Sequence, residues 1–149
     1  FDGAAIDATH VKAHRSAAGG KRRAFAQAIG NSRGGRTTKV HGLVDARGRP
    51  RVLLLSPGNI NDISMADALI QVAGPFRRLI ADRGYDAAHL RRRLAARGAE
   101  AVIPSTASRK VPIPYDINAD KERNRVERMW CMLKDFRRVA TRDDKLARN

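Results

Sequence analysis

One carboxylate stands inside an apolar segment near the start of the chain. Asp7 interrupts the run AAIDATHV, whose alternation predicts a strand over 4–11, with Asp7 and Thr9 on one face and Ile6 on the other. A carboxylate on a buried strand costs free energy unless something pairs with it, and a divalent cation is the usual partner. The fold must therefore bring a partner to Asp7.

Apolar patterns and Gly or Pro breaks divide the rest of the chain into strands and helices. Strands are predicted over 37–45, 51–55, 79–81 and 101–103, and helices over 63–73, 87–97 and 120 to about 145. In the first helix, apolar residues recur at the spacing of one helix face: Met65, Ala68, Leu69 and Val72. In the second, Leu90 and Leu94 are predicted to face inward, with Arg91 to Arg93 and Arg97 in solvent. A basic loop over 15–36 and a Pro-rich connector over 104–119 are predicted to be irregular.

The order of these elements predicts a topology. Three strands are followed by helix, strand, helix, strand and helix, which is the ribonuclease H-like order, with the first strand central and the fourth parallel beside it. We therefore expect an α/β fold with a mixed five-stranded sheet flanked by helices, in one domain over 1–149. Asp82 ends the fourth strand, so it would meet Asp7 at the carboxyl ends of adjacent parallel strands, the usual ligand site of an open α/β sheet.

The last predicted helix carries charges beside an apolar stripe. The stripe consists of Val126, Met129, Trp130 and Leu133. At about 100° per residue, Arg123, Glu127 and Lys134 fall within about 40° of one another at its edge. Glu127 would then lean onto the sheet edge and join the two aspartates, although a glutamate in mid-helix is normally just solvated.

The charge balance limits the partners. The chain has 30 Lys and Arg against 15 Asp and Glu, a formal net charge of +15. Such a surface gains by displacing counterions from phosphate, so a polyanionic partner is expected, although a ribosomal or histone-like protein would show the same balance. No apolar run approaches the roughly 20 residues of a membrane span, so we expect a soluble cytoplasmic protein with no membrane partner. Because Phe1 is not Met, we expect a fragment of a longer chain.

Cysteine and histidine usage adds little. A single cysteine, Cys131, permits no internal disulfide and is compatible with a reducing cytoplasm. His10 and His14 have the i,i+4 spacing of a zinc site on a helix, but they lie on a predicted strand and its exit, where that spacing does not converge. Lining of a cleft or local hydrogen bonding is the favoured role of His10.

Other polar residues allow two interpretations each. Asn61 and Asp62 either act in the site from their loop or cap the helix that follows, and we favour the cap. Asp86 is likewise expected to cap the next helix. Tyr85 either stacks on a splayed base or packs in the core.

Five segments carry a family resemblance: IDATHVKAHR, GNSRGGRTTKVHGLVD, SPGNINDI, ADRGYDA and ERNRVERMWCMLKDFRRVATR. Together they resemble bacterial insertion-sequence transposases of the DDE type, in the group with a Tyr-x2-Arg-x3-Glu-x6-Lys signature, over nearly the whole chain. Arg123, Glu127 and Lys134 match that spacing. Asp120 stands where the group has Tyr, and Asp143 stands where relatives usually have an aromatic residue.

The resemblance implies metal-dependent cutting at transposon ends and joining to target DNA. Asp7, Asp82 and Glu127 would hold two magnesium ions, which manganese should replace because both metals accept hard oxygen ligands. Arg123 and Lys134 would contact phosphates beside the cut. Four further arginines are expected at DNA: Arg33, Arg36, Arg137 and Arg138.

The resemblance also implies the partners, the oligomeric state and the location of the protein. The partners would be terminal inverted repeats and target DNA, a homo-oligomer would assemble on that DNA, and the protein would be nucleoid-associated in a bacterial cytoplasm. Two other functions stay open: a stand-alone nuclease of the same fold, and a catalytically inactive, basic nucleic-acid-binding remnant. Asp120 and the expected truncation of both ends favour the remnant.

Overall fold

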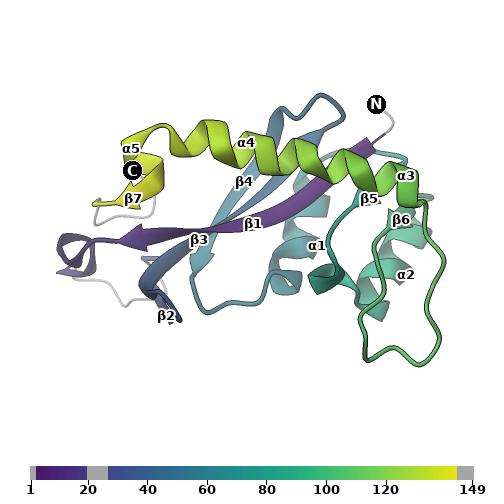
Figure 1. Cartoon of the computed structure of the whole chain (residues 1–149), viewed down its shortest axis with the longest axis horizontal. Helices are drawn as coiled ribbons and strands as arrows, with labels where there is room; N and C mark the ends of the chain where they lie inside the picture. The colour runs from purple at the N-terminus through teal and green to yellow at the C-terminus, as the bar shows by residue number, and fades with distance from the viewer. Residues whose placement is uncertain (1–2, 20–26, 144–149) are drawn as a thin grey trace.

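The computed structural model describes residues 3–19 and 27–143, which form one mixed sheet with helices on both faces (Figure 1). The strands are β1 (Gly3–Ala13), β2 (Gly30–Ser32), β3 (Gly35–Asp45), β4 (Pro50–Pro57), β5 (Arg78–Ile80), β6 (Glu100–Val102) and β7 (Thr141–Arg142). The α-helices are α1 (Ile63–Val72), α2 (Ala88–Ala96), α3 (Ile117–Asp120), α4 (Asn124–Lys134) and α5 (Arg137–Ala140). Three short 3-10 turns are η1 (Arg15–Gly19), η2 (Arg83–Tyr85) and η3 (Lys121–Arg123).

The central strand is β1. It pairs antiparallel with β3 and parallel with β5, and β4 and β6 pair with the outer edges of those two strands. This is the strand arrangement expected from the element order. Ala5 of β1 is aligned with Ile80 of β5. Asp7 and Asp82 each lie two residues further along the chain, so they lie at the same height along the two parallel strands.

The sheet has seven strands among the described residues rather than the expected five. The expected basic loop contains β2, which forms a hairpin with the start of β3, and Gly35 takes a φ of 89° there, a conformation that favours glycine. Residues 20–26 of that loop lie outside the described residues. At the other end of the chain, β7 pairs in parallel with the end of β1. The physical reason for β7 is the length of β1, which has 11 residues against three in β5 and therefore offers a free edge.

The final helix is shorter than predicted. It begins at Ile117, runs through α3, η3 and α4, and ends at Lys134 rather than near residue 145 (Figure 1). Phe136 is extended, and the chain then forms α5 and β7. Arg142 explains the change, because its buried guanidinium donates to Gln27 O at 2.5 Å and to Thr38 Oγ1 at 2.8 Å. These contacts between distant segments could not be read from helical periodicity.

Helices cover the sheet on two sides. On one face, Ile6, Leu43 and Leu79 pack with apolar residues of α1 and α2. On the other, α4 packs on β1 and β3. Trp130 lies against Gly42, where a Cβ would come within 2.8 Å of the indole ring, so only glycine admits this packing.

Two predictions of helix faces need correction. In α1 the buried residues are Ala66, Leu69 and Ile70, while Val72 is 67% exposed, so the predicted face was displaced around the helix. In α2 Leu90 and Leu94 are buried as predicted, but Arg91 is not free in solvent because it is bound to Asp86. No helix in the described part of the chain is long and apolar enough to cross a membrane.

Candidate active site

Two aspartates lie at neighbouring positions of the sheet. Asp7 is half-buried in the middle of β1, on the face covered by α4, and Asp82 lies two residues beyond the end of β5. The Asp82 Oδ1 accepts a hydrogen bond of 2.8 Å from Gly84 N. A Cβ at Gly84 would lie 2.9 Å from that oxygen, so glycine allows the tight turn that holds the carboxylate. The structure thus brings together the first two predicted site residues.

The surroundings of Asp7 disfavour its charge. Burial raises the pKa of the Asp7 carboxyl, and the nearby Asp82 and Asp62 raise it further, against a lowering by the backbone N–H of Ala8. The indole Nε1 of Trp130 also lowers this pKa, yet it forms no hydrogen bond of standard geometry within the described residues. Within that part of the chain, Asp7 has no ion-pair partner. An acid of this kind is stabilised by a bound cation.

Tyr85 lies beside these carboxylates. Its ring is fully buried in the core, so the alternative of stacking on a splayed base is wrong. Burial raises the pKa of the Tyr85 hydroxyl, and Asp62, Asp7 and Asp82 add to the rise. The hydroxyl has no hydrogen-bond partner among the described residues.

A third aspartate approaches from the loop after β4. The expected capping role of Asp62 is wrong: its backbone is already helical and its side chain makes no cap hydrogen bond. Instead, Lys39 Nζ donates to Asp62 Oδ1 at 2.8 Å and to Ile60 O at 2.7 Å. Lys39 is only 8% exposed, and an ammonium buried this far is stable only when such acceptors surround it. Sequence reasoning missed Lys39, because a lysine on a strand normally reaches solvent.

Glu127 is placed on α4 but not with the two aspartates. Its side chain is 51% exposed, and Oε1 accepts a hydrogen bond of 2.8 Å from Arg123 Nη1. Arg123 Nε also lies 3.8 Å from Asp120 Oδ1. Within residues 3–19 and 27–143, no three His, Cys, Asp or Glu side chains gather closely enough to hold a metal ion.

The other residues of the signature border the same region. Lys134 Nζ donates to Thr9 Oγ1 at 2.6 Å, and Thr9 shares the face of β1 that carries Asp7. Arg123 lines a pocket of about 420 Å³ together with Asp82, Tyr115 and Asp120. In the predicted apolar stripe of α4, Val126, Met129 and Trp130 are buried and Leu133 is partly buried. The charged residues Arg123, Glu127 and Lys134 lie along the edge of this stripe.

The other predicted DNA-binding residues lie at two places. Arg33 and Arg36 are exposed on the β2–β3 hairpin, and Arg137 and Arg138 are exposed on α5. His10 and His14 contact nearby side chains of the chain. His10 Nδ1 lies 3.4 Å from Thr37 Oγ1, and His14 Nδ1 lies close to side-chain oxygens of Ser16 and Asp143.

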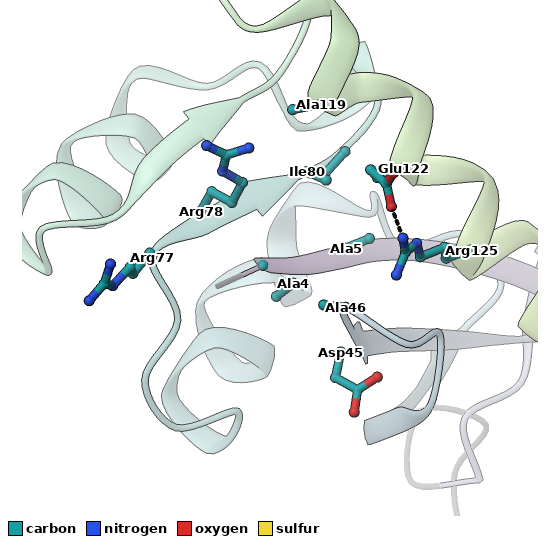
Figure 2. Close-up of a pocket in the computed structure, with 11 residues that line it drawn as sticks. Ala4, Ala5, Asp45, Ala46, Arg77, Arg78, Ile80, Ala119, Glu122 and Arg125 are labelled. Carbon is teal, nitrogen blue, oxygen red and sulfur yellow. Dashed lines mark ion pairs between the residues drawn. The ribbon is translucent and has the colours of Figure 1, made fainter. Parts of the chain in front are cut away.

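A separate pocket of about 400 Å³ lies at the amino-terminal ends of β1 and β5 (Figure 2). Two of its arginines are in ion pairs: Arg125 pairs with Glu122, and Arg78 lies 3.4 Å from Glu100, which is outside the pocket lining. Because Asp7 and Asp82 lie toward the opposite ends of these strands, this pocket is no part of the acidic site.

Comparisons with known proteins agree with this geometry. A family model described as the transposase DDE domain matches residues 2–149, and the chain belongs to that family. It is 36% identical over 110 residues to a protein of Brucella ovis named as the transposase for insertion sequence element IS6501, a match that covers 73% of this chain and 85% of that protein. It is 35% identical over 121 residues to the protein named for element IS402 of Burkholderia cepacia, covering 74% of this chain and 55% of that one.

One solved structure is also similar. The piggyBac transposase, in a synaptic complex with hairpin DNA, superimposes with a TM-score of 0.50 at 15% identity. The match covers 76% of this chain and 25% of the piggyBac chain. At this identity the likeness concerns the fold alone. The resemblance to bacterial insertion-sequence transposases of the DDE type is therefore confirmed by the family model and the two sequence relatives.

Proposed function

We propose that residues 1–149 are a ribonuclease H-like catalytic domain of a DNA transposase, which cuts transposon ends and joins them to target DNA. The observation that carries the proposal is the pair of Asp7 and Asp82 at the same level of two parallel strands, with the pKa of Asp7 raised. The order of the strands and the family membership support the same conclusion.

The donor set of this site fits a hard divalent cation. Carboxylate oxygens suit magnesium and manganese, and Asp7 and Asp82 would hold the metal between them. Glu127 would complete the site after leaving Arg123, because its exposed side chain can turn without disturbing the core. Two bound magnesium ions, which manganese should replace, would activate water or a DNA 3′-hydroxyl and stabilise the leaving oxygen.

The side chains of α4 would position DNA at these acids. Once Glu127 turns away, the Arg123 guanidinium is available to hold a phosphate with two parallel hydrogen bonds. Lys134, fixed by Thr9 on the acidic face of β1, would contact the adjacent phosphate as a point charge. The packing of Trp130 on Gly42 keeps α4 in register with the sheet.

The proposal extends to the partners. The protein would bind terminal inverted repeats and target DNA in the bacterial cytoplasm, associated with the nucleoid, and would act as a homo-oligomer assembled on DNA. Arg33, Arg36, Arg137 and Arg138 would add sequence-independent phosphate contacts.

One observation favours the inactive remnant as a second candidate. Asp120 stands where the signature that the chain resembles has Tyr, and it shares a pocket with Asp82 and Arg123. Its carboxylate competes with phosphate for Arg123, and its Oδ1 is buried without a hydrogen-bond partner among the described residues. Asp120 therefore weakens engagement of a DNA end in this pocket.

A strand-transfer assay with the complete natural protein separates these functions. A labelled transposon end is incubated with unlabelled target DNA and magnesium. A transposase cuts and joins, a nuclease only cuts, and a remnant only binds. We expect Asp7→Asn, Asp82→Asn and Glu127→Gln to abolish both steps.

The matched control for the helix variant is Glu122→Gln, which lies on the preceding turn and pairs with Arg125. It should retain activity. Full metal-dependent cleavage by Glu127→Gln would show that the third ligand is misplaced, whereas cleavage by Asp7→Asn would overturn the site itself.

A further inference from the structure

A basic cleft lies on the other face of β1 from the Arg123–Lys134 edge. It has a volume of about 490 Å³ and is enclosed by the end of β1, the β2–β3 hairpin and the loop after β4. Its basic lining residues are His10, Lys12, Arg33 and Lys39. Because alternate residues of a strand face opposite sides, His10 points away from the face that Thr9 shares with Asp7.

The walls of the cleft are fixed by close packing. A Cβ at Gly58 would lie 1.8 Å from Thr37 Oγ1 and 2.9 Å from Thr37 O, so glycine is required there. A Cβ at Gly30 would lie 2.0 Å from Asn59 Oδ1, so a larger residue there would displace the Asn59 side chain. Gly58 N also donates to Thr37 O at 3.0 Å. Thr37 Oγ1 in turn donates to Ser32 Oγ at 3.0 Å. The hairpin and the loop therefore form one surface rather than two independent segments.

The composition of this surface favours the binding of an anion. Among the described residues that line the cleft there is no carboxylate and no Phe, Tyr or Trp. Lys12 and Arg33 are exposed and form no ion pair with any residue of the described part of the chain. Without an aromatic ring the cleft cannot stack a base, so it suits the sugar-phosphate backbone of a nucleic acid.

Lys39 connects the cleft to the acidic site. Its side chain lines the cleft and binds Asp62, whose charge acts on the Asp7 carboxyl. His10 is three residues from Asp7 on the same strand and lies within reach of the charges of Lys39 and Lys134. Basic groups thus flank Asp7 on both faces of β1, on α4 and in this cleft.

We propose that the cleft binds the phosphate backbone of the target DNA, while the α4 edge holds the transposon end. The inference rests on the proposed function. Two basic surfaces on opposite faces of one strand suit a reaction that brings two DNA molecules to the same acids. Contacts with phosphates alone carry no sequence information, so we expect this cleft to hold duplex DNA whatever its sequence.

The test compares Lys12→Gln/Arg33→Gln with the wild-type complete protein. Arg92→Gln is the matched control, since Arg92 is exposed on α2 and has no ion pair within the described residues. Joining of a pre-cut labelled end is measured against target DNA concentration, and cutting of an uncut end is measured in parallel. We expect the double variant to need about tenfold more target DNA for half-maximal joining, the equivalent of about 1.4 kcal/mol. Its rate of joining should fall several times more than its rate of cutting.

Binding of plain duplex DNA tests the cleft separately. The slope of log affinity against log salt should fall by about 1.8 in the double variant, at about 0.9 for each lost phosphate contact. An unchanged slope would overturn the cleft as a DNA site even if the protein cuts and joins. Equal loss of cutting and joining would overturn the assignment to target DNA, because the cleft would then hold the flank of the transposon end. If the wild type neither cuts nor joins, the proposed function fails, whereas the slope still decides whether the cleft binds phosphate.

Discussion

Asp86 and Asp7 are two shielded acids with opposite surroundings. The Asp86 side chain is inaccessible to solvent, and it accepts hydrogen bonds of 2.8 Å from Arg91 Nε and from Arg109 Nη2. Arg109 Nε donates another at 2.9 Å, and the backbone N–H of Thr106 donates a fourth at 2.8 Å. The hydrogen bond from Arg109 is the main reason that the pKa of Asp86 lies well below its ordinary value, although burial opposes it.

Asp7 has no arginine donor among the described residues, and only the backbone N–H of Ala8 and the indole of Trp130 lower the pKa of its carboxyl. Burial, Asp82 and Asp62 raise its pKa, and no Lys or Arg of the described chain pairs with it. This contrast separates a structural acid from a functional one. Asp86 is paired with two arginines of the chain and joins α2 to the connector, whereas Asp7 needs a cation from outside the chain. Asp82 and Asp86 are only four residues apart in sequence, so the local motif alone does not decide which is which.

The largest expected effect is on catalysis. Asp7→Asn and Asp82→Asn should reduce magnesium-dependent cutting of a labelled transposon end to background, because each removes a metal ligand. DNA affinity, measured by fluorescence anisotropy, should stay equal or rise slightly, because a negative charge facing phosphate has gone. Asp67→Asn is the control, since Asp67 pairs with Arg93 on the surface. Cutting by either site variant would show that Asp7 and Asp82 are not needed for catalysis.

The next effect is on stability. Asp86→Asn should lower the free energy of unfolding by about 3 kcal/mol in a urea titration, because it leaves two arginines without their shielded partner. Asp7→Asn should leave this free energy unchanged or raise it, because it removes a carboxylate whose charge the folded state disfavours. Equal destabilisation by both variants would show that the two acids play the same structural role.

The dependence of stability on pH should also distinguish the two acids. The pKa of the Asp7 carboxyl is raised from 3.8 in the folded protein. The contribution of Asp7 to the free energy of unfolding is therefore fully present below pH 3.8 and is lost as pH rises through the folded pKa. The pKa of Asp86 is lowered from 3.8, so its contribution is present above that value and is lost as pH falls. In metal-free denaturation series, Asp7→Asn should therefore gain stability relative to wild type as pH rises above 3.8. Asp86→Asn should approach wild type as pH falls below it. The opposite trends would contradict the assigned environments.

The smallest effect concerns the partly exposed pair of Arg123 on η3 and Glu127 on α4. Arg123→Gln should change the free energy of unfolding by no more than about 0.5 kcal/mol, because both partners of its bond with Glu127 are partly exposed. It should nevertheless raise the concentration of transposon end needed for half-maximal cutting. A loss of stability comparable to that of Asp86→Asn would mean that the Arg123–Glu127 pair is structural and that Glu127 is not free to turn toward the aspartates.

The sequence predicted the central sheet because alternation and buried runs are local signals. The same signals placed Asp7 and Asp82 together, since parallel neighbours share their carboxyl ends. They could not show β7, whose pairing with β1 joins residues far apart in the chain. They also missed the Lys39–Asp62 pair, because the partner of a loop aspartate depends on tertiary packing.

The orientation of Glu127 was beyond the sequence for a different reason. Helical spacing placed it on the same side of the helix as Arg123, but spacing does not say which partner an exposed side chain selects. In the structure that partner is Arg123. The approach of Glu127 to the two aspartates stays a prediction.

Metal binding tests the central claim most directly. Manganese is titrated into the complete protein and its bound fraction is followed by electron paramagnetic resonance, for the wild type, Asp7→Asn, Asp82→Asn and the control Asp67→Asn. The account predicts saturable binding in the wild type and the control, competition by magnesium, and loss of that binding in both site variants. Saturable binding that is unchanged in Asp7→Asn and Asp82→Asn would contradict it.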